Sequence, residues 1–157
     1  MGAPLKIVSG GQTGVDRAAL DAALAAGLAC GGWCPRGRWA EDGPIAQRYP
    51  LDETPETAPA QRTAWNARDS DATLVVSRGA PAGGSALAIE RARAEGRPVM
   101  VLDLATESDV RAVERWLDRC GARVLNVAGP RESEAPGIYE QALHLLTALI
   151  EQLPRGD

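Results

Sequence analysis

The sequence of 157 residues has few aromatic residues, few cysteines and a single histidine. It contains no Phe, and its aromatic side chains are four Trp and two Tyr. No run of about 18 apolar residues occurs, which excludes a hydrophobic membrane-spanning segment. The formal net charge of −4 argues against electrostatic capture of nucleic acid. We therefore expect neither a membrane nor a nucleic acid as a partner.

The cysteines Cys30, Cys34 and Cys120 and the lone His144 form no recognisable framework. An odd number of cysteines at these spacings fits no disulfide scaffold, and a tetrahedral zinc site needs more ligands close in sequence. The N-terminal residues lack the features of a signal peptide. We expect a reduced, cytoplasmic protein without zinc or another metal site. His144 lies off the apolar face of its helix, so we expect it on the surface or at a subunit contact.

Apolar, β-branched runs alternate with helical patterns along the whole chain. The runs expected to form strands are 5–9, 28–33, 72–77, 99–102 and 124–128. The helical patterns cover 15–26, 59–69, 85–95, 106–120 and 138–153, and the fourth opens with Thr106-x-x-Asp109, which is close to a capping box. Continuously apolar strands that alternate with helices indicate a parallel sheet covered on both faces. We predict one doubly wound α/β domain over residues 1–157, with a mainly parallel sheet of five or slightly more strands.

Residues 33–58 show little periodicity and include Trp33, Arg36, Arg38 and Trp39. Structureless loops of more than about 12–15 residues in compact domains are often lids or binding loops. Two Trp and two Arg close together suit a planar or anionic ligand. The alternative is a connection whose Trp side chains plug the sheet edge.

Three glycine-bearing loops follow the first, third and fifth expected strands, at residues 9–17, 77–85 and 129–137. Glycines let backbone N–H groups approach a ligand, and the N-terminus of the following helix favours negative charge. In a doubly wound sheet, ligands bind beyond the carboxyl ends of the strands where the strand order reverses. If the order is 2-1-3-4-5, the first and third loops face one crevice. We predict a small-molecule ligand there that carries a phosphate or another oxyanion.

Charged residues near these loops have competing interpretations. Asp16 gains from the macrodipole of its helix, but it would repel a phosphate unless it binds hydroxyls or a cation while Arg17 offsets its charge. Arg62 and Asn66 share a helix face, so both could reach one ligand. Arg131 follows a strand end, where a guanidinium could bind an oxyanion, and the neighbouring Glu132 suits a hydroxyl or amine.

Several segments together resemble the molybdenum cofactor carrier family, a branch of the Rossmann-like SLOG superfamily. They are residues 7–16, 32–38 with 40–43, 49–51, Arg62-Thr63 with Asn66, Ser70-Asp71 with Thr73-Leu74, and 125–133. The resemblance covers essentially the whole chain. It implies a Rossmann-like homo-oligomer that binds the molybdenum cofactor, a pterin with a phosphate tail and an oxo-metal centre.

The loops and the resemblance together give one set of expected binding residues. These residues are Gly10, Gly11, Gln12, Thr13, Gly14, Asp16, Arg17, Arg36, Arg38, Arg62, Asn66, Gly83, Gly84, Ser85, Arg131 and Glu132.

A more distant resemblance is to the LOG phosphoribohydrolases, in which an Arg and a Glu serve N-glycosidic cleavage of a nucleoside monophosphate. The matching residues here are Arg62, Ser70-Asp71, Gly83-Gly84 and Glu90. Thr63, Ala86 and Leu87 stand where that family has Lys, Gly and Thr, which argues against the activity. The favoured function is therefore a carrier or binding protein. A hydrolase using Glu90 with Arg62 is the alternative, and a sensor of a nucleotide derivative is a third possibility.

Overall fold

The computed structural model describes residues 4–106 and 109–154. Its central sheet contains the strands β1 (Lys6–Val8), β2 (Cys30–Gly31), β7 (Ala72–Ser77), β8 (Val99–Asp103) and β9 (Val124–Ala128). The helices are α1 (Val15–Ala25), α2 (Pro59–Arg68), α3 (Gly83–Ala94), α4 (Val110–Cys120) and α5 (Ile138–Gln152). Every neighbouring pair of strands in this sheet is parallel. The predicted α/β class with a parallel five-stranded sheet is confirmed, and the fold is Rossmann-like.

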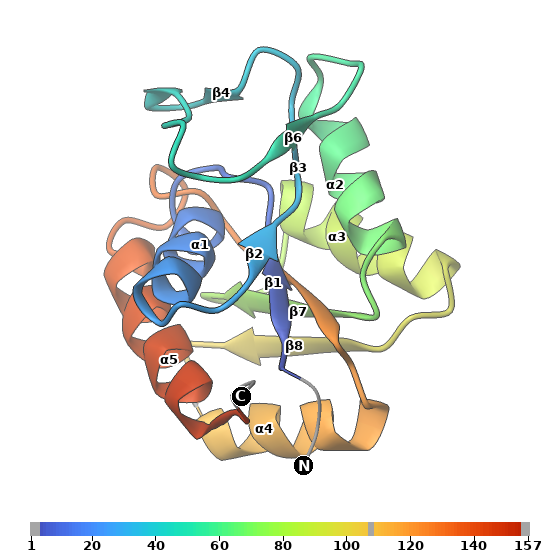
Figure 1. Ribbon diagram of the computed structural model, residues 1–157, viewed down its shortest axis with the longest axis vertical. Coiled ribbons are helices and arrows are strands. Elements are labelled where there is room, and N and C mark those ends of the chain that lie inside the picture. The colour runs from blue at the N-terminus through green and yellow to red at the C-terminus, as the bar shows by residue number, and fades with distance from the viewer. Residues whose placement is uncertain (1–3, 107–108, 155–157) are drawn as a thin grey trace.

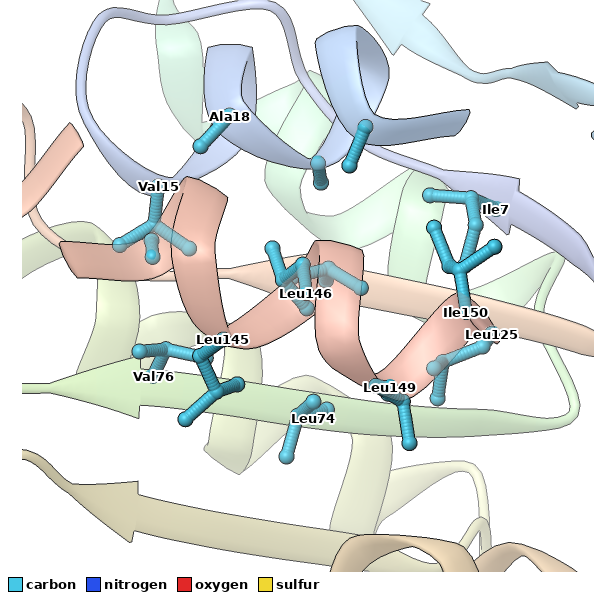
Figure 2. Packing of buried hydrophobic residues seen from close by; sticks show 14 of the residues in the cluster. Ile7, Val15, Ala18, Leu74, Val76, Leu125, Leu145, Leu146, Leu149 and Ile150 are labelled. Atoms are coloured by element: carbon cyan, nitrogen blue, oxygen red, sulfur yellow. The ribbon is translucent and has the colours of Figure 1, made fainter. Parts of the chain in front are cut away.

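Helices cover both faces of the sheet. On one face α1 packs against α5, with α4 beside α5, and on the other α2 pairs with α3 (Figure 1). Alternate side chains of β7, Leu74 and Val76, face Leu145 and Leu149 of α5 (Figure 2). A strand with a period of two and a helix with a period near 3.6 can both place apolar residues on this interface. The core between them is therefore continuous along the sheet.

The strand order is β2-β1-β9-β7-β8, so the assumed order 2-1-3-4-5 is wrong. The fifth main strand of the sequence, β9, lies between β1 and β7, and Leu125 pairs with Ile7 on one side and Ala72 on the other. Asn126 of β9 also donates a hydrogen bond to Thr73 Oγ1 of β7 at 3.2 Å. Consequently the carboxyl ends of β1, β9 and β7 are neighbours, and the three glycine loops leave the sheet side by side.

The expected strand 28–33 is shorter than predicted because Gly32 interrupts it. Gly32 has a φ of +130°, and a Cβ at this position would lie 2.3 Å from the Ser9 carbonyl oxygen. The chain turns away from the main sheet here and continues as β3 (Trp33–Cys34) in a separate two-stranded sheet with β6 (Asp52–Glu53). A glycine is required because the chain passes so close to the end of β1.

The start of α4 differs from the predicted helix 106–120. Thr106 donates its hydroxyl to the Asp103 carbonyl at 3.0 Å, in a turn after β8. The N-cap is Asp109, whose carboxylate accepts from the Arg111 N–H at 2.9 Å. Glu107 and Ser108 lie outside the described residues. The predicted capping box is therefore replaced by a single Asp cap.

The 33–58 loop is organised rather than structureless. Besides β3 and β6 it contains the hairpin of β4 (Trp39–Ala40) and β5 (Gly43–Pro44). Its apolar side chains form a second small core against Leu20 of α1; they are Cys34, Ala40, Ile45, Tyr49 and Leu51. The loop thus packs as a small layer above the carboxyl end of β1 (Figure 1).

Arg38 holds this loop together from within. It has a φ of +53°, and its guanidinium donates to four carbonyl oxygens of the same loop at 2.8–3.3 Å, those of Ile45, Ala46, Tyr49 and Leu51. The Arg38 side chain therefore provides hydrogen-bond donors for backbone carbonyls that have no partner strand.

In residues 4–106 and 109–154, no helix has both the length and the apolar character needed to cross a membrane.

Candidate functional site

A cavity of about 290 Å³ lies at the carboxyl ends of β1, β9 and β7. Its wall comes from the loop after β1, one side of α2, the N-terminus of α3 and the end of β9 with its following loop. These segments are distant in sequence and meet because β9 is inserted between β1 and β7. This is the edge of a doubly wound sheet at which ligands bind.

A buried pair of opposite charges forms part of the wall. Arg62 of α2 is 9% exposed and donates to the Gly10 carbonyl at 2.9 Å, and its Nη1 lies 3.9 Å from Asp16 Oδ2. Asp16 of α1 is 8% exposed. A Cβ at position 10 would lie 2.6 Å from Arg62 Nη1 and 2.9 Å from Asp16 Oδ2. Gly10 is therefore needed so that Arg62 and Asp16 can approach the loop.

Burial raises the pKa of Asp16 from 3.8 to about 6, and this effect outweighs the nearby Arg62 guanidinium and the amide of Gln12, which favour the ionised form. The Gln12 N–H donates to Asp16 Oδ2 over a long 3.4 Å. The Asp16 carboxyl can thus exchange a proton close to neutral pH.

The N-terminus of α3 faces the same cavity through Gly83, Gly84 and Ser85. Ala82 occupies the N-cap position and supplies no side-chain hydrogen bond to the helix, and Ser85 is buried. Uncapped N–H groups at the start of a twelve-residue helix, together with the helix dipole, favour an anion. The helix begins two residues earlier than the predicted 85–95, so both glycines belong to its first turn.

The two Trp residues of the 33–58 loop have different roles. Trp39 is 57% exposed and lines the cavity. Trp33 packs edge-to-face on Trp65 with ring centroids 4.9 Å apart, and its indole N–H donates to Asp69 at 2.9 Å. The ligand-facing interpretation therefore fits Trp39, and the packing interpretation fits Trp33.

Glu41 anchors the hairpin that carries Trp39. Its carboxylate accepts from the Thr13 hydroxyl and from the Ser133 N–H, the latter at 3.1 Å. Hydrogen bonds from Ser133 and Thr13 lower the pKa of Glu41. The hairpin is thereby tied to the loops after both β1 and β9.

Most of the predicted binding residues line this cavity. They are Gly10, Gln12, Asp16, Arg62, Asn66, Gly83, Gly84, Ser85 and Arg131. The Asn66 amide also fixes the start of the 33–58 loop, because it accepts from the Trp33 N–H at 2.8 Å and donates to the Trp33 carbonyl at 3.0 Å. Arg131 is exposed at the cavity and lies within 3.5 Å of Glu41 and Glu134.

Four other predicted residues, Thr13, Gly14, Arg17 and Glu132, lie around a second, more open depression. Arg17 donates to the Gly11 carbonyl and pairs with Asp42 at 3.0 Å. Glu132 accepts from the N–H groups of Gly137 and Tyr139, at 2.7 and 2.9 Å. Glu132 therefore caps the start of α5, and its role as an acceptor for a ligand hydroxyl or amine stays a prediction.

Three more predicted residues are not part of the cavity wall. Gly11 has a φ of +81°, and a Cβ there would lie 2.6 Å from Leu51 Cδ1, so its role is to let the 33–58 loop pack on the first glycine loop. Arg36 is exposed outside the wall. Arg38 is directed at the carbonyls of its own loop, as described above. The structure thus does not bring these three to the crevice.

Glu90, the candidate acid of the hydrolase alternative, is exposed on α3 and is not among the residues that line the cavity. His144 is exposed on α5. Within the described ranges, no group of three or more His, Cys, Asp or Glu side chains is placed to hold a metal ion.

Sequence reasoning missed Asn126 as part of the cavity wall. Its signal was a lone polar residue inside the apolar run 124–128. Thr63, Leu87 and Glu134 also line the cavity, and nothing in their local pattern sets them apart.

The fold and the cavity define a Rossmann-like protein with a cavity at the carboxyl ends of its strands. The chain belongs to the circularly permutated YpsA SLOG family, whose model matches residues 7–150. A crystal structure of a protein from Syntrophus aciditrophicus SB, described as a "putative molybdenum carrier protein", is 42% identical and superposes with a TM-score of 0.90. The match covers 94% of this chain and 96% of that one. No curated protein matches the sequence. The resemblance given by the sequence motifs is confirmed.

Proposed function

We propose that the chain binds the molybdenum cofactor, or a related pterin or nucleotide that carries a phosphate, and carries it without chemical turnover. The observation that supports the proposal most is the shared cavity of two anion-binding elements. The Arg62 guanidinium is buried in its wall, and the uncapped N-terminus of α3 faces it. A helix N-terminus with a nearby Arg suits a phosphate or an oxo-anion.

The size and chemistry of the cavity fit part of such a ligand. Pockets for small molecules span about 300–1,000 Å³, so a cavity of about 290 Å³ is at the lower end of the range. We expect Arg62 and the first turn of α3 to hold the phosphate, with Trp39 stacking on a planar ring at the mouth. The description of the 42% identical neighbour as a molybdenum carrier supports the same class of ligand.

The direct test is retention of the ligand by the purified protein. The protein is incubated with molybdenum cofactor released from a molybdoenzyme, and separately with molybdate, and is then desalted. Bound molybdenum is measured by metal analysis and bound pterin by fluorescence. We expect molybdenum and pterin to be retained together in an equal molar ratio after incubation with the cofactor. Retention of neither molybdenum nor pterin at high micromolar ligand would rule out the molybdenum cofactor as the ligand.

The hydrolase alternative is less well supported, because Glu90 is exposed away from the cavity wall. Release of free base from nucleoside monophosphates tests it, with Glu90→Gln beside the wild type. We expect no release from either protein. A rate in the wild type that falls in Glu90→Gln would instead favour the enzyme.

We also propose a homo-oligomer, which rests on the family resemblance. Sedimentation is expected to give a mass above that of the 16.5 kDa chain. A ligand-dependent change of that mass would favour the sensor alternative over simple carriage.

A further inference from the structure

Asp16 is an unexpected residue in the wall of a cavity that suits an anion. It is 8% exposed, and its carboxylate shares the wall with Arg62 and the N-terminus of α3. A buried carboxylate repels a phosphate or an oxo-anion at short range, because little water screens the two charges. The dipole of α1 favours this carboxylate in the free protein. A ligand that carries an anion must therefore be accommodated beside it.

The protein satisfies the Asp16 carboxylate only weakly. A carboxylate offers about four lone-pair positions. The Gln12 N–H reaches Oδ2 at 3.4 Å, and a backbone hydrogen bond from Gly10 also favours the ionised carboxylate. The Arg62 guanidinium remains 3.9 Å from Oδ2 while it donates to the Gly10 carbonyl at 2.9 Å. Acceptor capacity is left over, in a group that lines the cavity. A ligand with a hydrogen-bond donor can use this capacity.

We infer that Asp16 makes the cavity selective for anionic ligands that also present a hydroxyl or N–H donor, and that it disfavours tetrahedral oxyanions without such a donor. The ligand class is thus a phosphate ester of a sugar, pterin or purine, and free molybdate or sulfate is excluded. The inference rests on the proposed function, because it assigns the ligand class of the same cavity.

The selection follows from the hydrogen-bonding groups that each type of ligand presents to Asp16. A ring N–H, an exocyclic amine or a ribose hydroxyl donates to the carboxylate and forms a charge-assisted hydrogen bond. Ionised sulfate and molybdate offer only acceptors, so their oxygens would meet the Asp16 oxygens without a proton between them. Each mismatched pair leaves a buried polar group without a partner, which weakens binding.

The test compares the affinities of these ligand types in one assay. Isothermal titration at about pH 8 measures 6-hydroxymethylpterin monophosphate, guanosine 5′-monophosphate, sulfate and molybdate on the full chain, a pH at which Asp16 is ionised. For the wild type we expect at least one of the two organic phosphates to bind about tenfold or more tightly than either oxyanion.

Asp16→Asn is the decisive variant, since its amide can donate to an oxyanion. We expect the preference for the organic phosphate to shrink about tenfold, with a gain in sulfate affinity. Asp118→Asn is the matched control, because Asp118 is an exposed carboxylate on α4 outside the cavity wall, and we expect it to keep the preference. Thermal melts establish that both variants are folded.

A second measurement needs no variant. Sulfate stays doubly ionised between about pH 8 and about pH 5, a range in which Asp16 gains a proton. The charged groups that share this site are Arg62 from α2, Arg17 on the same helix, and Arg131 with Glu134 after β9. The arginines stay charged, and Glu134→Gln removes the other carboxylate. We expect wild-type sulfate affinity to rise as the pH falls, in Glu134→Gln as well.

The outcomes separate this inference from the proposed function. Equal affinity for molybdate or sulfate and for the organic phosphates, an unchanged preference in Asp16→Asn, or a sulfate affinity that does not rise with acid overturns the inference alone. If neither organic phosphate, neither oxyanion nor the molybdenum cofactor binds to the wild type, both the inference and the proposed function are overturned.

Discussion

Asp16 and Asp21 lie on the same helix, α1, yet their surroundings are organised in opposite ways. The Asp21 carboxylate accepts hydrogen bonds from the hydroxyls of Tyr49 and Tyr139, each at 2.5 Å, and from Arg48 at 3.3 Å. Asp16 receives hydrogen bonds from backbone groups of Gln12 and Gly10, the Gln12 N–H at a long 3.4 Å, and stands 3.9 Å from the Arg62 guanidinium. The Asp21 carboxylate is therefore well supplied with hydrogen-bond donors, whereas the Asp16 carboxylate has acceptor capacity left over.

The region around Asp21 is where the 33–58 loop packs on α1. The guanidinium groups of Arg17 and Arg48 each lie over the Tyr49 ring, at 5.4 and 4.4 Å from its centre. Arg38 completes the region by bonding four carbonyls of the loop. The polar groups here bind one another, so their interactions contribute to the stability of the fold. In the cavity beside Asp16 the polar groups keep unused capacity, which is what a binding site requires.

The largest expected effect is that of Arg38→Ala on stability. The substitution removes four hydrogen bonds from one cation, and at about 1 kcal/mol each we expect the free energy of unfolding to fall by about 4 kcal/mol. Urea denaturation measures the change. Arg36→Ala, two residues away on an exposed side chain, is the control and should change it by less than about 0.5 kcal/mol. Similar losses in both variants would contradict this role of Arg38.

Asp16→Asn is expected to stabilise the fold, the opposite of the usual effect of a buried polar change. Burial raises the pKa of Asp16 from 3.8 to about 6, so the folded chain holds a proton that the unfolded chain releases. This contribution to stability is complete below about pH 4 and is lost as the pH rises through about 6. At pH 7 the variant should gain up to about 3 kcal/mol.

The stability gain of Asp16→Asn should disappear below about pH 4, because residue 16 is then uncharged in the wild type as well as in the variant. Urea denaturation between about pH 4 and pH 8 tests this window. A constant difference across the range would show that the charge of Asp16 is not the cause.

Arg62→Ala should weaken ligand binding by about thirtyfold, because a buried charge-assisted hydrogen bond contributes about 2 kcal/mol. Arg68→Ala is the matched control on the same helix, since Arg68 pairs with Asp69 on the surface. Titration with the phosphate ligand compares the two variants with the wild type. Equal affinities in all three proteins would remove Arg62 from the proposed site.

Much of the sheet edge could be predicted from the sequence. Glycine loops after apolar runs predict backbone that meets at the carboxyl ends of strands, and Gly10, Gly83 and Gly84 do line one cavity. The strand order could not be predicted, because β7 and β9 are both mainly apolar and buried on two faces, and such a pattern selects no neighbour. The insertion of β9 became visible only in the register of Leu125 with both Ile7 and Ala72.

The roles of the arginines could not be predicted from the local sequence pattern either. Arg38 and Arg62 were both predicted to bind the ligand. Arg38 instead donates to carbonyls of its own loop, whereas Arg62 is buried against Gly10 in the cavity wall. The difference depends on how the 33–58 loop packs around its own small core, and the hydrophobic periodicity of the sequence does not predict this packing. Asp16 and Asp21, five residues apart on one helix, likewise differ in partners that are distant in sequence, namely Arg62 beside Asp16 and Tyr139 bonded to Asp21.

Tyr139→Phe tests the saturated side of the comparison and should have the smallest effect. Asp21 would keep Tyr49 and Arg48 as donors and lose one hydroxyl, so we expect about 1 kcal/mol less stability in urea denaturation. Burial and the hydrogen bond to Asp21 raise the pKa of Tyr139 above its usual value, so this contribution should fade as the pH rises well above about 10. Affinity for the phosphate ligand should not change, because Tyr139 lies at the open depression and not in the wall of the cavity. A loss of affinity together with the loss of stability would mean that the two sides of α1 are coupled.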